Sequence, residues 1–377
     1  MAEANQVSAT KSEIKKTTRD YDDLEQRLGT WLGEQLPGRD PAITAMVVPD
    51  SNGMSSETIL LDVATNDGAT TRYVVRVAPL DDAFPVFRSY DLDLQFRVMK
   101  LVAERSDVPV PAMVWLELDG SKVGSPFLVM ERLDGVVPPD NLPYPFGDNW
   151  LYDASREDQR RLQDTTIAAM AGIHGIELTD DDRAFLDTKA PGDTALRRHV
   201  EDQKAYHQWV TGGDLHPVIT KTFDWLEANW PEHDTDAFLS WGDGRVGNVM
   251  YQDFEPVGVL DWEMASLAPR EVDLAWTIFI HRFFEDIVAM LELPGMPHFM
   301  READVCATYE SITGHTPRDM RWYLVYAALR HGIVMAQVTR RAVAFGEAEM
   351  PDDPDDLIMH KPTLYEMLDG TYWDKMP

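Results

Sequence analysis

Residues 237–264 read AFLSWGDGRVGNVMYQDFEPVGVLDWEM, and three of their polar side chains, Asp243, Asn248 and Asp261, have a spacing that points to chemistry. Asp243 and Asn248 lie in a glycine-rich loop between short apolar segments, and Asp261 follows the apolar run 257–260. We expect the loop to join two strands and Asp261 to end a third, so that the three side chains gather at adjacent strand ends. Such oxygen ligands suit Mg²⁺, which usually takes one or two protein carboxylates together with substrate phosphates.

The spacing of these three side chains favours phosphoryl transfer. In kinases, one Asp positions or deprotonates the acceptor hydroxyl, while an Asn shortly after it and a second Asp hold Mg²⁺ on the nucleotide phosphates. An alternative interpretation is that Asp243 and Asn248 form a turn and that Asp261 caps the next one. The second Asp at the expected distance and a sheet-rich segment upstream favour the kinase-like interpretation.

The segment upstream is predicted to form a mostly antiparallel sheet with helices beside it. The expected elements are helices at 21–36 and 90–104 and strands at 43–48, 58–63, 72–78, 113–118 and 127–133. The polar turn at 66–68, Asn-Asp-Gly, is typical of a hairpin between the second and third strands.

Beyond a loop at 138–150 that is rich in Pro, Asn and Asp, the chain is expected to be mainly helical. Helical patterns cover 156–176, 194–210, 218–229 and 318–345. The sequence therefore predicts an α+β fold with an N-terminal extension and helix at 1–40, a small antiparallel-sheet lobe at 41–135 and a larger helical lobe at 136–377. A cleft between two such lobes is a natural ligand site.

The composition argues against several classes of function. The net charge of −31 argues against nucleic acid or an anionic membrane as the main partner. No apolar run of the ~18 residues needed to span a membrane is present. A single cysteine excludes an intrachain disulfide, and the polar N-terminus has no secretory core, so a cytoplasmic location is expected. The sequence does not indicate an oligomeric state.

These motifs resemble the aminoglycoside phosphotransferase-like family, which has the protein-kinase-like fold. The family's catalytic loop H-G-D-x-x-x-x-N is matched by 241–248, its metal strand V-x-D-W-E by 259–263, and its D-L-A-W motif by 273–276. The resemblance covers about residues 40–345, with the closest likeness to actinobacterial proteins assigned as aminoglycoside phosphotransferases. Related kinase-like domains occur fused to some acyl-CoA dehydrogenases.

The resemblance implies roles for the residues of the catalytic loop. It makes Asp243 the catalytic base and makes Asn248 and Asp261 the Mg²⁺ ligands. Arg245 would neutralise phosphate or pair with Asp243, with an exposed loop arginine as the alternative. Trp241 stands where the family usually has histidine, and a tryptophan there is structural because an indole cannot shuttle a proton.

The resemblance also implies two supporting roles in the helical lobe. Asp273 would brace the catalytic loop through backbone hydrogen bonds, and an acid favoured by a helix N-terminus is a compatible interpretation. His174 matches a family position that is expected to hold a buried structural histidine.

The nucleotide would contact a loop in the sheet lobe. The loop at 50–57, DSNGMSSE, matches neither G-x-G-x-x-G nor a Walker A pattern, and by itself it reads as a polar hairpin turn. The resemblance makes Gly53, Ser55 and Ser56 candidate phosphate contacts.

Further residues of the sheet lobe are expected on the nucleotide side. Two of these positions, Arg76 and Gln95, differ from the family's residues. Arg76 stands where kinases place the phosphate-binding lysine, with a solvent-facing strand residue as the alternative. Gln95 occupies the place of its acidic partner and could accept a hydrogen bond from Arg76 without forming an ion pair. The backbone of Glu131 to Leu133 would contact adenine, and Met130 would belong to the core or line the adenine pocket.

We therefore expect a Mg²⁺-dependent phosphotransferase that moves the γ-phosphate of ATP, with GTP as the alternative donor, to a hydroxyl of a small molecule. The acceptor would be aminoglycoside-like or another hydroxylated compound. Aromatic residues in the C-terminal helices suggest an apolar acceptor pocket, although they equally suit a core: Trp276, Phe279, Phe283, Phe284, Trp322, Tyr323 and Tyr326. The alternatives are a kinase acting on a hydroxyacyl-CoA-type metabolite and a catalytically inactive kinase-like nucleotide-binding protein.

Overall fold

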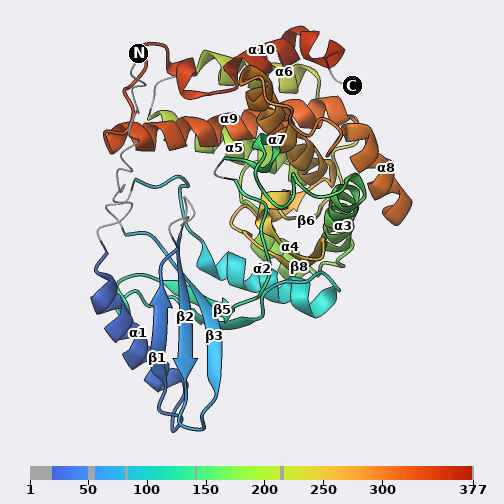
Figure 1. Cartoon of the computed structure of the whole chain (residues 1–377). Coiled ribbons are helices and arrows are strands. Elements are labelled where there is room, and N and C mark those ends of the chain that lie inside the picture. Colours follow the sequence, from blue (N-terminus) through green and yellow to red (C-terminus); the bar gives the residue numbers. More distant parts are fainter. Residues whose placement is uncertain (1–18, 50–55, 81–83, 141, 213–215, 376–377) are drawn as a thin grey trace, which may run out of the picture.

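The two expected lobes are present in the structure, a computed structural model that describes residues 19–49, 56–80, 84–140, 142–212 and 216–375. Figure 1 shows the sheet lobe at the bottom and the helical lobe above it. The fold class predicted from the sequence is confirmed: an α+β, kinase-like arrangement of a small antiparallel sheet and a larger helical part. Among the described residues, no helix has the length and apolarity to cross a membrane.

The sheet of the small lobe has five antiparallel strands in the order β1-β2-β3-β5-β4. Their bounds are β1 Ala42–Val47, β2 Glu57–Ala64, β3 Thr70–Val77, β4 Met113–Glu117 and β5 Phe127–Glu131. The predicted hairpin between β2 and β3 is confirmed. Its turn is closed by the carboxylate of Asp67, which accepts from the Thr65 hydroxyl at 2.6 Å and the Ala69 N–H at 3.1 Å.

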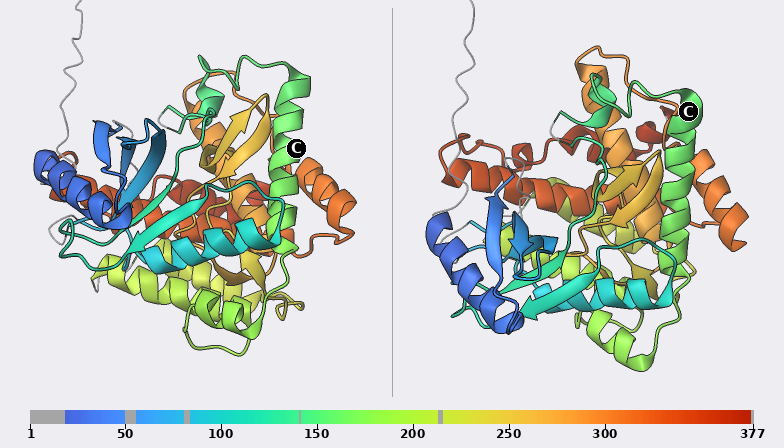
Figure 2. Two further views of the ribbon diagram at one scale, coloured as in Figure 1. Left: turned by 90° about the horizontal axis from the view of Figure 1, so that it is seen from below. Right: turned by 60° about the horizontal axis from the view of Figure 1, so that its bottom comes forward.

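The two faces of this sheet are covered by different elements, since successive side chains of a strand alternate between faces. Helix α1 (Tyr21–Gln35) packs Leu28 and Trp31 against the face that carries Val75 and Phe127. Helix α2 (Leu92–Arg105) belongs to the larger core, which the opposite face joins through Leu128 and Met130. Figure 2 shows α1 on the outer side of the sheet and α2 on the side toward the helical lobe.

The helical lobe consists of helices α3 to α10 and four short strands. The helices are α3 Arg156–His174, α4 Asp180–Leu186, α5 Ala195–Thr211, α6 Pro217–Ala228, α7 Glu271–Met290, α8 Glu302–Thr313, α9 Met320–Ala344 and α10 Lys361–Asp369, with single 3-10 turns η1 Tyr144–Phe146, η2 Val246–Asn248, η3 Pro354–Leu357 and η4 Thr371–Asp374. The strands are β6 Phe238–Ser240, β7 Val249–Gln252, β8 Glu255–Val259 and β9 Ser266–Ala268.

These strands form two separate pairs, β6 with β9 and β7 with β8. Asn248 precedes β7 and Asp261 follows β8, so these two side chains stand at neighbouring strand ends, as expected. The expectation that β6, which leads to Asp243, neighbours those strands is wrong, because β6 pairs with β9. The sequence analysis did not identify β9, a strand of three residues.

The connection from β3 to α2 is held against the helical lobe. The Tyr206 hydroxyl of α5 donates to the Val86 carbonyl at 2.7 Å, and the Tyr206 ring stacks on Phe87 at a centroid distance of 6.1 Å. Gln337 of α9 donates to the Pro85 carbonyl at 2.6 Å. These contacts fix how the two lobes face each other.

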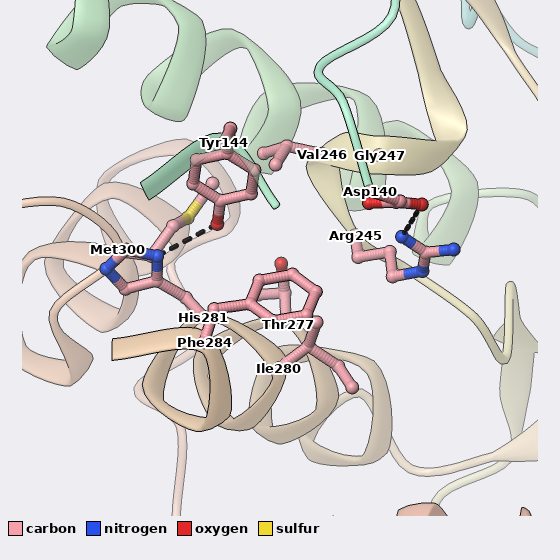
Figure 3. Close-up of a pocket in the computed structure, with 10 residues that line it drawn as sticks. All are labelled: Asp140, Tyr144, Arg245, Val246, Gly247, Thr277, Ile280, His281, Phe284 and Met300. Atoms are coloured by element: carbon pink, nitrogen blue, oxygen red, sulfur yellow. Dashed lines mark hydrogen bonds and ion pairs between the residues drawn. The ribbon is translucent and has the colours of Figure 1, made fainter. Parts of the chain in front are cut away.

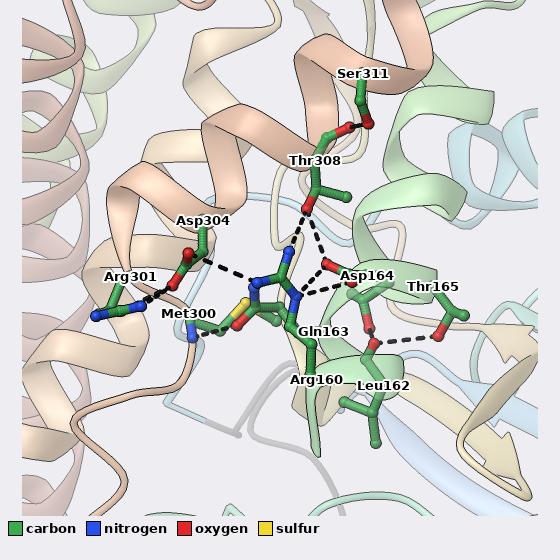
Figure 4. Close-up of polar contacts among 11 residues, drawn as sticks. Arg160, Leu162, Gln163, Asp164, Thr165, Met300, Arg301, Asp304, Thr308 and Ser311 are labelled. Atoms are coloured by element: carbon green, nitrogen blue, oxygen red, sulfur yellow. Dashed lines mark hydrogen bonds and ion pairs between the residues drawn. The ribbon is translucent and has the colours of Figure 1, made fainter. Parts of the chain in front are cut away.

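A polar cluster ties α8 to α3 (Figure 4). Arg160 of α3 contacts Asp164 at 2.8 Å and donates to the Thr308 hydroxyl of α8 at 3.2 Å. Thr308 in turn donates to Asp164 at 2.8 Å, while Asp304 lies 3.6 Å from Arg160. The cluster lies at the surface and fixes the position of α8 without contributing a group to the cleft.

Candidate active site

The loop between β6 and β7 rests on a single buried carboxylate. Asp273, in the first turn of α7, is fully buried and accepts from the Ser240 hydroxyl at 2.8 Å and from the backbone N–H groups of Trp241 at 2.8 Å and Gly242 at 2.9 Å. His174 lies 2.9 Å from the same carboxylate and holds Tyr309 with its other ring nitrogen. Burial opposes ionisation, but these donors, led by His174, hold the pKa of Asp273 below its usual range. The bracing contacts expected of Asp273 and the structural place expected of His174 are therefore present.

Trp241 and Gly242 fix the path of the chain just before Asp243. The indole of Trp241 is fully buried, donates to the Leu260 carbonyl at 2.8 Å and packs against Trp262. Gly242 has φ +90°, and a Cβ there would approach the Met264 carbonyl oxygen to 2.1 Å. The position that is histidine in the resembling family is thus a neutral structural contact here, and the next position requires glycine.

The carboxylate of Asp243 receives three nitrogen donors. Trp276 donates its indole N–H at 2.7 Å, Asn248 its amide at 2.6 Å and Arg245 its Nε at 3.1 Å. The Asp243 side chain keeps 17% of its surface exposed. Sequence reasoning missed Trp276 as a partner, although the spacing of Asp273 and Trp276 on one helix face was visible in the sequence.

Arg245 is held between two acids, which excludes the alternative of an exposed loop arginine. Besides Asp243 it is paired with Asp140, a residue that sequence reasoning did not single out. Burial alone would lower the pKa of Arg245, but Asp243 and Asp140 outweigh it, so the pKa lies above its usual value. The cation is therefore permanent and fixes the orientation of the Asp243 carboxylate.

A narrow hollow lies beside Arg245, between α7 and the η1 turn (Figure 3). Tyr144 bonds His281 at 2.8 Å on one side of it, and burial lowers the pKa of His281 to about 3, so this ring is neutral. The expected aromatic acceptor pocket is not found here. Phe284 lines the hollow, whereas the other six aromatic residues are buried in the core: Trp276, Phe279, Phe283, Trp322, Tyr323 and Tyr326.

Asn248 and Asp261 offer oxygen atoms suited to a divalent cation. Asn248 uses its amide nitrogen on Asp243, and its Oδ1 makes no hydrogen bond to any residue that the structure describes. Asp261 adopts φ +60°, unusual for a residue other than glycine, and the Leu260 N–H bonds the Asn248 carbonyl at 2.9 Å. In the described part of the chain, no group of three or more His, Cys, Asp or Glu side chains is placed to hold a metal ion. An ion bound at these two residues would therefore complete its shell with water or phosphate, as Mg²⁺ does.

Arg76 reaches across the cleft from β3 to this pair. Its Nε donates to the buried Ser56 hydroxyl at 2.6 Å, and its Nη2 lies 3.5 Å from Asp261. With 15% of its side chain exposed, Arg76 is not the solvent-facing residue of the alternative interpretation. Gln95 is buried in α2, and the hydrogen bond that a glutamine could accept from Arg76 is not made. Gly53 and Ser55 lie outside the described residues.

In the link between the lobes, the hydrogen bonds already present leave fewer backbone groups for the predicted contact with adenine. Met130 is a core residue at 8% exposure. The backbone N–H groups of Glu131 and Arg132 already donate to Ala112 and Arg72, at 2.9 and 3.1 Å. The backbone of Leu133 makes no hydrogen bond to a described residue, which leaves it as the candidate among the three positions.

Comparison with known proteins agrees with this geometry. Residues 47–299 match the profile of the "Phosphotransferase enzyme family". A protein of Ralstonia eutropha JMP134 named as an aminoglycoside phosphotransferase superposes with a TM-score of 0.63 and 22% identity, covering 93% of this chain and 98% of the other. "Macrolide 2'-phosphotransferase type I" superposes with a TM-score of 0.57 and 15% identity, covering 92% and 97%. Both similarities are evidence of a shared fold.

Curated relatives are larger proteins. The Arabidopsis thaliana "Probable acyl-CoA dehydrogenase IBR3" is 24% identical over 306 residues, which cover 77% of this chain and 35% of the relative. The human "Acyl-CoA dehydrogenase family member 11" is 25% identical over 205 residues, covering 54% and 24%. This chain thus spans about a third or less of these relatives. The family match over two thirds of the sequence leads to one conclusion: the chain belongs to the phosphotransferase enzyme family and has a kinase-like fold.

Proposed function

We propose that this protein transfers the γ-phosphate of ATP to a hydroxyl of a small molecule and that it depends on Mg²⁺. The observation that supports this most strongly is a chain of contacts: Asn248 bonds Asp243, the Leu260 N–H bonds the Asn248 carbonyl, and Arg76 lies 3.5 Å from Asp261. A carboxylate, two metal-binding oxygens and a cation are the groups that kinases use for positioning and for charge stabilisation.

The nucleotide would lie between the lobes, with the sheet lobe at 41–135 as its main binding surface. Arg76 would contact the phosphates, and its contacts with Ser56 and Asp261 hold the guanidinium near the metal ligands. Gly53 and Ser55 belong to the same proposal as phosphate contacts, and Leu133 would hydrogen-bond the base. Mg²⁺ bound by Asn248 and Asp261 would neutralise phosphate charge. ATP is preferred here only by the family likeness, and GTP fits the same contacts.

Asp243 would act on the acceptor. Its carboxylate accepts the hydroxyl proton while the acceptor oxygen forms a bond to the γ-phosphorus and the bond from that phosphorus to the nucleotide breaks. Trp276 and Arg245 hold the carboxylate in place during the transfer. Because Trp241 is buried and cannot relay protons, proton transfer rests on Asp243.

The helical lobe at 136–377 would bind the acceptor. Structural neighbours carry the names of aminoglycoside and macrolide phosphotransferases, and curated relatives carry the name of acyl-CoA dehydrogenases. We therefore include both aminoglycoside-like compounds and hydroxyacyl-type metabolites among the acceptors. A cytoplasmic location belongs to the proposal because the chain has one cysteine and its donor would be cellular ATP.

A second candidate is an inactive nucleotide-binding protein, favoured by Trp241 and Gln95 at two family positions. An acceptor screen separates the two. ADP release is measured with Mg²⁺-ATP and a panel of hydroxylated compounds for the wild type and Asp261→Asn. Acceptor-dependent release that requires Mg²⁺ and is lost in the variant supports transfer. Nucleotide binding without such release for any acceptor would support the inactive alternative.

A further inference from the structure

Arg330 in the middle of α9 is a buried cation that forms no ion pair with a described residue, while Asp273, Asp243 and Asp202 act on its charge from a longer distance. The residue is 1% exposed, and its guanidinium donates one hydrogen bond, from Nη2 to the Gly242 carbonyl at 3.0 Å. Its Nε and Nη1 atoms have no hydrogen-bond partner, and no carboxylate is ion-paired with it, among the residues that the structure describes. Burial lowers the pKa of this group. Buried arginines are normally paired, because an uncompensated charge in the interior is costly.

Arg330 lines a cavity of about 160 Å³ beside the catalytic loop. Four other segments contribute to the wall: Phe87–Ser89, Thr188, four residues of α5 (His199, Asp202, Gln203 and Tyr206) and residues 263–266. A cavity of about 150 Å³ is enough for a benzene ring, so a small organic molecule or part of a larger one fits.

Of the two arginines on this wall, Arg330 is the one without a direct ion pair to a described residue. Arg88 is paired with Asp202 at 2.5 Å. His199 bonds Tyr326 at 2.5 Å, and burial lowers its pKa to about 3, so it is neutral. Glu263 adds a second carboxylate, so the wall as a whole is mixed in sign. The positive character is thus local to Arg330, and an anionic group would have to bind there.

The cavity adjoins the proposed base through two short paths. Arg330 and Met264, both in the wall, contact Gly242, the residue before Asp243. The Arg330 guanidinium also lies 4.6 Å from the ring centre of Trp276, whose indole donates to Asp243 at 2.7 Å. Asp243 itself does not line the cavity, so a molecule bound there is linked to it through Arg330, Gly242 and Trp276.

We propose that this cavity binds the anionic group, a carboxylate or a phosphate, of the acceptor, and that Arg330 is the residue that binds it. The inference rests on the proposed phosphotransferase function and deepens it by naming the class of acceptor: a hydroxylated small anion. A polycationic acceptor would place further positive charge beside a buried arginine, which opposes binding.

The test uses the full chain and three variants. Arg330→Met removes the cation, and Arg340→Met removes the same charge ten residues later on α9 as a matched control. Gln203→Glu adds a negative charge to the cavity wall without touching Gly242, so its effect is separate from any effect on the catalytic loop. The probes are glycerate and 3-hydroxybutyrate as carboxylates, glycerol 3-phosphate as a phosphate, glycerol and butane-1,3-diol as neutral counterparts, and kanamycin as a polycation.

Phosphate transfer to each probe and calorimetric binding of each probe and of ADP are measured. We expect wild type to prefer one anionic class over its neutral counterpart, which decides between carboxylate and phosphate. Arg330→Met and Gln203→Glu should weaken that anion by about 10- to 100-fold, the loss of a charge-assisted contact. Gln203→Glu should change KM and leave kcat, and Arg340→Met should change neither. ADP binding should stay the same in all variants.

Equal use of anionic, neutral and cationic probes by the wild type, or anion binding that is the same in Arg330→Met, would overturn the inference. Transfer to a neutral or cationic acceptor would leave the proposed function standing while this inference fails. Arg330-dependent anion binding in a protein that transfers no phosphate would leave the binding site standing while the proposed function fails.

Discussion

The two sides of the catalytic loop use their polar groups differently. On the buried side, Asp273 receives hydrogen bonds from two backbone N–H groups, a serine hydroxyl and a histidine, and has no contact with solvent. On the cleft side, Asp243 also receives several donors, yet 17% of its side chain is exposed, and Asp261 is 26% exposed. The number of hydrogen bonds is therefore a poor guide to the role of an aspartate in this loop.

The roles of Asp273 and Asp243 differ because a ligand can reach only the partly exposed Asp243. The Asp273 carboxylate is saturated by the protein and can only hold the loop, whereas Asp243 and its neighbours retain oxygen atoms that a ligand can reach. Five predictions test this contrast, and they run from the largest expected effect to the smallest.

Removing the proposed base, Asp243, should reduce phosphate transfer without changing nucleotide binding or stability. Asp243→Asn keeps the shape of the side chain but cannot accept a proton as a carboxylate does, so phosphate transfer should fall by about 10²- to 10⁴-fold. ADP affinity and the urea unfolding curve should stay unchanged. Asp253→Asn, in the exposed turn between β7 and β8, is the control. Retention of most of the activity by Asp243→Asn would remove this residue from the proposed chemistry.

Changing the buried carboxylate, Asp273, should lower the stability of the protein. Asp273→Asn turns an amide N–H₂ toward donors that need an acceptor, so the free energy of unfolding should fall by about 3–5 kcal/mol. Urea denaturation measures the change, again with Asp253→Asn as the control. A loss below about 1 kcal/mol, the worth of an ordinary hydrogen bond, would show that the loop does not depend on this carboxylate.

Removing the cation of Arg76, on β3 of the sheet lobe, should weaken nucleotide binding. Arg76→Met removes a cation that lies between Ser56 and Asp261, and ATP affinity should fall by about 10- to 100-fold, as for loss of a charge-assisted contact. Arg72→Met is the matched control, since Arg72 lies on the same strand and pairs with Asp134 at the surface. Equal losses in the two variants would mean that the position of Arg76 over Asp261 has no special role.

Buried histidines should make the fold sensitive to acid. The pKa of His281 is lowered to about 3 by burial, so between its ordinary value of 6.5 and about 3 the unfolded chain takes up a proton that the folded chain does not. Stability therefore decreases as the pH falls through this window. From pH 7.5 to 5.0, His281→Gln should lose about 2 kcal/mol less unfolding free energy than the wild type. Identical losses in urea titrations at the two pH values would exclude this contribution.

The surface cluster far from the cleft should matter least. Arg160→Ala removes the contacts from α3 to Thr308 and Asp304 of α8, and exposed ion pairs contribute about 0.2–1 kcal/mol. Thermal unfolding should shift slightly, and phosphate transfer should not change. A large loss of activity would show that the position of α8 influences the cleft.

Most of the fold could be predicted from the sequence, because its helices and strands have clear apolar periods. The hairpin of β2 and β3 and the long helix α9 lie close to their expected bounds. The short strand β9 escaped prediction because three residues show no period, and its pairing with β6 is a contact distant in sequence. The aromatic residues of α7 and α9 suggested a pocket, yet a sequence does not show whether a ring faces a cavity or the core.

The candidate site was predictable where residue type and spacing matter together. Asp243, Asn248 and Asp261 are separated as phosphoryl transfer requires, and the structure brings all three to the cleft. Partners that depend on tertiary contacts escaped: Asp140 beside Arg245 comes from a loop 105 residues away. Arg330 escaped for the same reason, since its burial without a direct ion pair exists only in the folded state.

The direct test of the account is the fate of the γ-phosphate. ATP labelled at that phosphate is incubated with Mg²⁺ and the acceptor panel, and product is followed with wild type and Asp243→Asn at matched nucleotide occupancy. The account predicts label on an acceptor hydroxyl with the wild type and a loss of about 10²-fold or more with the variant. Label that appears only as free phosphate, at the same rate in both proteins, would contradict it.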